Sequence, residues 1–288
     1  MNIALGATRL AMNALTPVRR IPNPFAPSLQ SQVDGKVVVI TGASRGIGRS
    51  LAERVAQAGA TVVLVARRED ELNEIVRGIE QRGGIAHAIA ADLASDDGIN
   101  HVADIVLNKF GAPDILVNNA GRSIMRSVAA SEFRLHDYER TMRINYLAGV
   151  GLTLRFLPAM RARRSGHIVH SSSIGVIANL PRFSAYIGSK AALEAVLRCA
   201  EVESYRDNIK FTDVHIPLAD TDMAAAAEMQ QFRRLTLDEV TDVMVDAIRT
   251  RPRVVNNPLG SLYALTYQYA PWLGNLAQNY VHRTSPEQ

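Results

Sequence analysis

Residues 37–57 read VVVITGASRGIGRSLAERVAQ, and this stretch decides the fold. The β-branched run Val37–Ile40 predicts a short buried strand. The glycine-rich segment Thr41–Gly48 follows it, and the stretch that continues to Ala58 is typical of a helix. Glycines at such a turn let the backbone approach a ligand closely, and the helix offers free N–H groups to phosphate oxygens. The segment therefore predicts a nucleotide site, although its spacing, G-x-x-x-G-x-G, also occurs in ordinary loops.

The rest of the chain repeats this alternation. Further strands are predicted at Thr61–Val65, Ile85–Ala90, Asp114–Val117, His167–His170, Lys210–His215 and Arg253–Asn256, and helices at Glu69–Arg82, Ile99–Phe110, Phe133–Met160, Ala185–Tyr205 and Asp238–Thr250. Continuous apolar strands separated by helices imply a parallel sheet covered on both faces. We predict an α/β protein with one doubly wound, Rossmann-type domain over residues 34–256. An N-terminal extension (1–33) precedes this domain, and an apolar helical tail (257–288) follows it.

The end of the second predicted strand decides between the two nicotinamide dinucleotides. NAD sites usually carry an acidic residue there, roughly 20 positions after the glycine turn, which binds the ribose 2′-hydroxyl. This strand instead ends in VARR at 65–68, with no carboxylate at its tip. Arg67, together with Arg45 of the glycine turn, would hold a 2′-phosphate through charge-assisted hydrogen bonds. The pattern favours NADP(H); the alternative is that both arginines are solvated surface charges.

Composition argues against several other classes of protein. The net charge is only +4, and the densest basic run, RARR at 161–164, is typical of a solvent-facing helix end, so we predict no nucleic-acid partner. The seven histidines show no metal-ligand spacing, which predicts no metal site. Cys199 is the single cysteine, and we interpret it as a small buried residue in a reducing compartment. No apolar stretch is long enough to span a bilayer and the N-terminus does not resemble a secretory signal, so we expect a cytoplasmic protein.

The tail is rich in leucine, tyrosine and tryptophan, with residues 259–282 reading LGSLYALTYQYAPWLGNLAQNYVH. This composition fits a helix that closes the substrate side of the domain, or a subunit interface. A peripheral contact with a membrane surface is the other interpretation.

Four motifs in register resemble the short-chain dehydrogenase/reductase superfamily. They are T-G-x-x-x-G-I-G at 41–48, N-N-A-G at 118–121, Ser173, and Tyr186 with Lys190. The resemblance covers Lys36 to Pro217. Residues 118–124, 136–142 and 181–186 are further similar to the bacterial fatty acyl-CoA reductase group, whose relatives include mycobacterial reductases of very long acyl chains. The segment PLADTDM at 217–223 is also similar, but Asp220 and Asp222 stand where that group has a basic residue and a proline.

The predicted chemistry is the reduction of a carbonyl group. Hydride addition builds negative charge on the carbonyl oxygen, so the enzyme must donate a proton to it. Tyr186 is the predicted donor, and Lys190, one helical turn later, would lower the pKa of its hydroxyl. By resemblance, Ser173 lies at the usual interval of thirteen residues before Tyr186 and polarises the carbonyl, whereas Ser172 would lie behind it. Asn145 matches the helix asparagine that positions a water linking Lys190 to a proton relay.

The resemblance also implies where the cofactor and the substrate bind. The predicted cofactor residues are Gly42, Ser44, Arg45, Gly46, Ile47 and Gly48 of the turn, Arg67, Asp92 and Leu93 at the adenine end, Asn118, Ala120 and Gly121 along the cofactor, Tyr186 and Lys190 near the nicotinamide ribose, and Pro217 and Thr221 beside the carboxamide. Substrate contacts are expected from 219–235, where Ala224–Ala227 and Met229 suggest an apolar lid.

We therefore expect an NADPH-dependent reductase of a long-chain lipid carbonyl, converting fatty acyl-CoA to fatty aldehyde. The alternative is a reductase of 3-oxoacyl chains or other lipid ketones to alcohols, which would use the same residues. A third interpretation, from another class, is a non-catalytic NADP-binding regulator. Such proteins commonly lose the tyrosine or the lysine, and this chain has both. The family habit implies a homodimer or homotetramer that assembles through Phe133–Met160 and Ala185–Tyr205.

Overall fold

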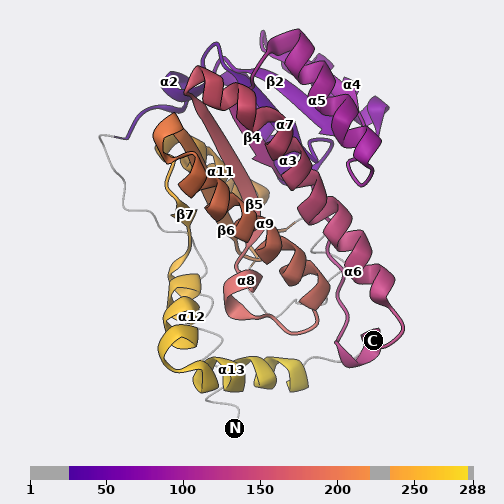
Figure 1. Cartoon of the computed structure of the whole chain (residues 1–288), viewed down its shortest axis with the longest axis vertical. Helices are drawn as coiled ribbons and strands as arrows, with labels where there is room; N and C mark the ends of the chain where they lie inside the picture. The colour runs from indigo at the N-terminus through magenta and orange to yellow at the C-terminus, as the bar shows by residue number, and fades with distance from the viewer. Residues whose placement is uncertain (1–25, 221–233, 285–288) are drawn as a thin grey trace.

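The computed structural model describes residues 26–220 and 234–284, and one parallel sheet organises them (Figure 1). The strand order is β3-β2-β1-β4-β5-β6-β7, with every neighbouring pair parallel. The strands are β1 (Val37–Thr41), β2 (Thr61–Ala66), β3 (Ile85–Ala90), β4 (Ile115–Asn118), β5 (Gly166–Ser173), β6 (Ile209–Ile216) and β7 (Val254–Val255). The chain runs from β1 outward to β3 and then returns to β4 on the other side of β1. Ligands bind at the carboxyl end of such a reversal, and the predicted Rossmann-type fold is confirmed.

Helices cover both faces of the sheet (Figure 1). They are α2 (Leu29–Val33), α3 (Gly46–Gln57), α4 (Glu69–Gln81), α5 (Asp96–Phe110), α6 (Leu135–Met142), α7 (Ala148–Arg163), α8 (Gly175–Ala178), α9 (Ser184–Glu203), α11 (Leu237–Thr250), α12 (Pro258–Tyr269) and α13 (Pro271–Thr284), with short turns at Ala129–Ser131 and Tyr205–Asp207. Alternate residues of β1 enter two separate cores. Val38 and Ile40 pack with α3, α4 and α11, whereas Val39 packs with α5, α7 and α9.

The long helix predicted over Phe133–Met160 is not continuous. Phe133 precedes α6 and is 87% exposed, and a π-helical turn, Arg143–Leu147, separates α6 from α7. A π turn inserts one extra residue into the helix, so the side chains after it shift around the axis, and such turns are frequent at functional sites. Asn145 lies within this turn and is buried.

One other prediction is corrected by the structure. Cys199 is exposed, not buried, because α9 turns Leu193, Leu197 and Ala200 toward the core and leaves position 199 on its outer side. The apolar tail forms two helices, since Pro271 lacks the N–H that would continue α12 and instead begins α13. Among the described residues, the structure has no helix that combines the length and the apolar character needed to cross a membrane.

Candidate active site

A cavity of about 1510 Å³ lies at the carboxyl end of the sheet. The carboxyl ends of six strands and the turns after them contribute to its lining, with residues drawn from 42–47, 65–68, 91–94, 119–123, 171–175 and 216–220. The cavity therefore spans the reversal of strand order on both sides of β1, as the fold class predicts. Thr221 and the predicted lid residues Asp222, Ala224–Ala227 and Met229 lie outside the described residues.

The backbone of the glycine turn packs so closely on its neighbours that Gly42 and Gly48 cannot be replaced by larger residues without a clash. Gly42 has φ +65°, and a Cβ atom there would lie 2.8 Å from the Cα atom of Ala120. A Cβ atom on Gly48 would collide with the carbonyl oxygen of Gly42. The first turn of α3 begins at Gly46 without a side-chain cap, which leaves N–H groups for an anionic ligand. These features fit the pyrophosphate of a dinucleotide.

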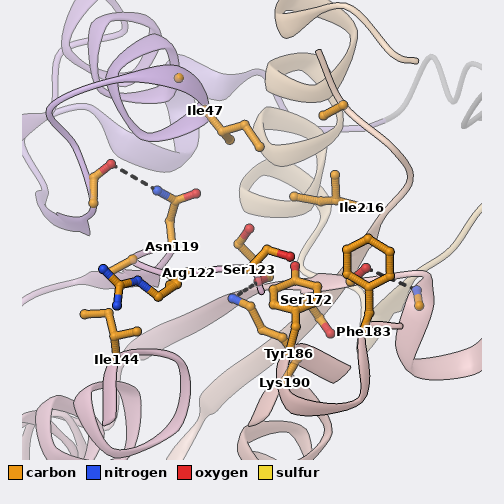
Figure 2. Close-up of a pocket in the computed structure, with 18 of the residues that line it drawn as sticks. Ile47, Asn119, Arg122, Ser123, Ile144, Ser172, Phe183, Tyr186, Lys190 and Ile216 are labelled. Atoms are coloured by element: carbon orange, nitrogen blue, oxygen red, sulfur yellow. Dashed lines mark hydrogen bonds between the residues drawn. The ribbon is translucent and has the colours of Figure 1, made fainter. Parts of the chain in front are cut away.

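Thr41 and Asn119 hold the turns after β1 and β4 together. Thr41 Oγ1 accepts hydrogen bonds from the backbone N–H groups of Asn119 and Ala120, at 3.0 and 2.9 Å. Asn119 Nδ2 donates to the carbonyl oxygen of Thr41 at 2.9 Å, and also to that of Gly42 at 3.3 Å (Figure 2). Sequence reasoning chose Asn118 for the cofactor, but Asn118 is buried and does not line this cavity, whereas Asn119 does. Neighbouring side chains at a strand end point to opposite sides of the sheet. This alternation could have shown that only one of the two asparagines faces the cavity.

The cavity lining is strongly basic. It includes six arginines and Lys190 but only three carboxylates among the described residues. The arginines are Arg45, Arg67 and Arg68 near the ends of β1 and β2, and Arg122, Arg140 and Arg143 near the end of β4 and on α6 and the π turn; the acids are Asp92, Glu139 and Asp220. This balance suits ligands that carry several phosphates. Of the predicted cofactor residues, Ser44, Ile47, Leu93, Gly121 and Pro217 also line the cavity, and Gly48 does not.

Tyr186 and Lys190 project into this cavity from α9, beside the end of β5 (Figure 2). Lys190 Nζ donates a hydrogen bond to the carbonyl oxygen of Ser171 at 2.7 Å. The Tyr186 hydroxyl is hydrogen-bonded to the Ser173 side chain. Ser173 Oγ also accepts a hydrogen bond from the N–H of Gly175 at 3.1 Å, which fixes its orientation. The structure thus brings the predicted serine, tyrosine and lysine together.

Burial controls the acidity of both groups on α9. It raises the pKa of Tyr186 to about 12, against a smaller opposite effect of the hydrogen bond with Ser173. The expected lowering of this pKa is therefore opposite to what the structure shows, because a buried tyrosinate loses its hydration. Burial also lowers the pKa of Lys190 to about 8, while the carboxylate of Glu194 acts to raise it. At neutral pH, Tyr186 holds its proton and Lys190 is charged.

Asn145 connects the turn after β4 to α9. Its Oδ1 accepts from the backbone N–H of Arg122 at 2.7 Å, and its Nδ2 donates to the carbonyl oxygen of Arg122 and to Ser189 Oγ. Ser189 Oγ in turn donates to the carbonyl oxygen of Tyr186 at 2.6 Å. The asparagine therefore positions both sides of the cavity, and its role in a water relay stays a prediction.

A buried polar group behind Lys190 was missed by sequence reasoning. Ser172 donates a hydrogen bond to Glu194, and His215 Nε2 lies 3.0 Å from Glu194 Oε1. Burial acts to raise the pKa of Glu194, but the hydrogen bond and charge of His215 hold it below its usual range. Glu194 lies four residues after Lys190 on the same helix, and that spacing was the available signal. Because the Ser172 side chain bonds to Glu194, it is Ser173 that bonds to the Tyr186 hydroxyl.

One end of the cavity, beside the C-terminal helices, is mostly apolar, with Gln278 of α13 as a polar member of its lining. Its lining there comes from α8, the segment before α9 and the two C-terminal helices, through Ala178, Leu180, Phe183, Leu259, Tyr263 and Val281. Phe183 packs edge-on against Tyr186, with ring centroids 6.5 Å apart. One cavity is therefore lined by Ser173, Tyr186 and Lys190, by a group of arginines and by a group of apolar side chains.

Comparison with known proteins agrees with this arrangement. Residues 36–231 match the family model described as short chain dehydrogenase. The chain is 45% identical to an uncharacterized oxidoreductase of Mycobacterium tuberculosis over 256 residues, covering 88% of this chain and 75% of the relative. It is 44% identical to the fatty acyl-CoA reductase of Acinetobacter baylyi over 248 residues, covering 86% and 84% of the two chains. A metagenomic short-chain oxidoreductase solved in complex with NADP superposes with a TM-score of 0.65 at 30% identity, covering 77% and 93%.

Proposed function

Because the chain belongs to the short-chain dehydrogenase/reductase family, we propose that it is an NADPH-dependent reductase of long-chain fatty acyl-CoA that produces the fatty aldehyde. One observation carries the proposal. The described lining of a single cavity joins basic groups suited to phosphates, the Ser173–Tyr186–Lys190 group and an apolar end. A non-catalytic regulator would not require Ser173, Tyr186 and Lys190 to lie together.

The residues of the site support a simple sequence of steps. Bound NADPH would supply the hydride to the thioester carbon. Ser173 would hold the carbonyl oxygen, and Tyr186 would donate its proton to that oxygen as the hydride arrives, which forms a hemithioacetal. Lys190, as an ammonium, would stabilise the tyrosinate left behind. The hemithioacetal would then lose its hydroxyl proton and break its C–S bond, so that one acyl-CoA, one NADPH and one proton give one aldehyde, one NADP⁺ and one free CoA thiol.

The preference for NADPH is proposed to depend on Arg67. Arg67 and Arg45 both line the cavity, and the solved relative with this fold binds NADP. A hydrogen bond to a charged group contributes about 1.5–3 kcal/mol, so Arg67→Ala should raise the KM for NADPH roughly 10-fold or more and leave that for NADH almost unchanged. Arg77→Ala, which removes an exposed arginine outside the cavity lining, is the matched control. Equal changes with NADH and NADPH would contradict the assignment.

One observation favours reduction of a thioester, and a second favours a substrate linked to CoA. The relative in Acinetobacter baylyi is named a fatty acyl-CoA reductase. The lining also holds Arg122, Arg140 and Arg143, a basic group separate in sequence from Arg45 and Arg67, which would suit the phosphates of CoA. A lipid ketone reductase would use the same serine, tyrosine and lysine, and product analysis separates the two.

Substrate chain length tests the lipid character of the site. Each methylene buried in the apolar end should contribute up to about 0.8 kcal/mol, or roughly 4-fold in kcat/KM. We therefore expect kcat/KM to rise steeply from butyryl-CoA to octanoyl-CoA and palmitoyl-CoA, measured as NADPH oxidation. Values that do not change along the series would contradict a long-chain substrate, and turnover only with 3-oxoacyl chains would favour the ketone reductase.

We also propose that the chain is divided into an extension (1–33), a catalytic domain (34–256) and a helical tail (257–288). We further propose that it forms a homo-oligomer. Leu154 on α7 is 64% exposed and Val202 near the end of α9 is 77% exposed, so assembly through these helices would cover apolar surface.

A further inference from the structure

The two C-terminal helices turn their apolar side outward. Seven large side chains form this surface, here called the C-terminal face: Leu262, Leu265 and Tyr269 on α12, and Trp272, Leu273, Leu276 and Tyr280 on α13, all between 43% and 76% exposed. On α12 they recur at spacings of three and four residues, and on α13 the pair Trp272 and Leu273 is followed by residues at the same spacings, which places them on one side of each helix. The opposite side of the helices carries buried Gly260, Gly274 and Gln278. A helix that packs only on its own domain would show the reverse distribution.

The helices are attached to the domain, so this face has a defined orientation. Tyr267 donates a hydrogen bond from its hydroxyl to the carbonyl oxygen of Ala178 in α8, at 3.2 Å. Gly274 packs so closely on the ring of Tyr267 that a Cβ atom would lie 2.8 Å from its Cζ atom. Asn257 caps α12 through a hydrogen bond of 2.7 Å from the N–H of Gly260. These contacts hold α12 on the body and α13 on α12.

The charge of the segment distinguishes among partners. Residues 257–284 contain no Asp, Glu or Lys, and Arg283 at the end of α13 is their one permanently charged residue. No carboxylate would have to leave water when the face is covered, and Arg283 would meet anionic headgroups favourably. The face combines the exposed leucines with tyrosine and tryptophan, which prefer the boundary between hydrocarbon and water.

The position of the face adds a second argument. Leu259, Tyr263 and Val281 of the same two helices line the apolar end of the cavity. A bilayer against the outer side of these helices would hold acyl chains next to the cavity, whereas a second copy of the chain would offer no such supply. We propose that the C-terminal face rests on the surface of an anionic lipid bilayer. Binding to the bilayer does not require catalytic activity. The uptake of a lipid substrate from the bilayer rests on the proposed function.

Trp272 makes the docking directly measurable. It is the only tryptophan in the chain and is 66% exposed on the face. Adding vesicles of phosphatidylcholine with phosphatidylglycerol to the full-length protein should shift Trp272 emission to the blue and sediment the protein with the lipid. Pure phosphatidylcholine should bind it more weakly. An unchanged emission spectrum, with the protein left in the supernatant, would overturn the proposal.

Paired variants locate the contact. Leu265→Glu combined with Leu276→Glu should weaken vesicle binding roughly 10-fold or more, since each exposed leucine loses its burial in lipid. Ile85→Glu is the matched control, because Ile85 is 54% exposed on β3, at the opposite edge of the sheet from β7, which leads into α12 (Figure 1). NADPH binding by each variant confirms that it is folded. Equal vesicle binding by the double variant and the control would refute the assignment.

Three further outcomes distinguish membrane docking from a subunit interface and from the proposed reaction. If light scattering shows that the double variant dissociates an oligomer, and wild type does not bind vesicles, the face is a subunit interface and the docking is wrong. If wild type binds vesicles but oxidises no NADPH with any acyl-CoA, the docking stands and the proposed reaction fails. If it reduces water-soluble butyryl-CoA or octanoyl-CoA but ignores vesicles, the reaction stands and the docking fails.

Discussion

Tyr186→Phe is expected to lower kcat for NADPH-dependent reduction roughly 10²-fold or more while NADPH binding is retained. The substitution removes only the hydroxyl group, which is the proposed proton donor and the partner of Ser173. The aromatic ring would remain packed edge-on against Phe183, so the fold and the cavity should persist. Without the donor, the oxygen that receives negative charge must take its proton from water.

Stopped-flow or steady-state NADPH oxidation gives kcat, and quenching of NADPH fluorescence or calorimetry gives its Kd. Tyr205→Phe removes the hydroxyl of a tyrosine that is 86% exposed and remote from the cavity lining, and it should behave as wild type. If Tyr186→Phe turned over as fast as wild type, Tyr186 could not be the proton donor.

Lys190→Met is expected to reduce kcat by a similar factor, roughly 10²-fold, because the tyrosinate would form without a nearby positive charge. Methionine has a similar length and fills much of the same buried space. Lys210→Met replaces an exposed lysine on β6 and is the matched control. A Lys190→Met variant with the kcat of wild type would show that the ammonium is not needed.

The pH profile of wild type provides a second readout for Lys190. Burial lowers the pKa of Lys190 to about 8, so its active, charged form predominates below that pH and is lost above it. Reductive kcat should therefore fall as pH rises through about 8, while Tyr186, whose pKa is raised to about 12, keeps its proton throughout this range. Lys190→Met should show no such fall near pH 8. A wild-type profile that is flat from pH 7 to roughly 9.5 would contradict the assigned pKa.

Local sequence signals predicted the fold well where they were strong. The VVVI run placed β1 and the pattern after the glycine turn placed the end of α3, each within one residue, and β3 was predicted at its observed bounds. Tyr186 and Lys190 could be found because their spacing puts them on one side of a helix and because the glycine turn, the N-N-A-G motif and Ser173 stand in register with them.

Features that depend on tertiary contacts were harder to predict. Asn118 and Asn119 are identical in type, and only the end of β4 decides which one faces the cavity. The π turn at Arg143–Leu147 was not predicted from the sequence, and its residue Asn145 bonds to Arg122 and Ser189 in other parts of the chain. The buried contact of Glu194 with His215 joins α9 to β6, a pairing that helix spacing alone does not reveal. The exposure of Cys199 likewise follows from how α9 is rotated on the sheet.

The central claim is that this cavity reduces a fatty acyl thioester with NADPH. The most direct test mixes the full-length protein with NADPH and palmitoyl-CoA and follows NADPH oxidation and free-thiol release in the same sample. We predict that one free thiol appears for each NADPH oxidised, with the fatty aldehyde as the other product. Both signals should be lost in Tyr186→Phe. Oxidation of NADPH without thiol release, seen only with a 3-oxoacyl or other ketone substrate, would contradict the claim and make the protein a lipid ketone reductase.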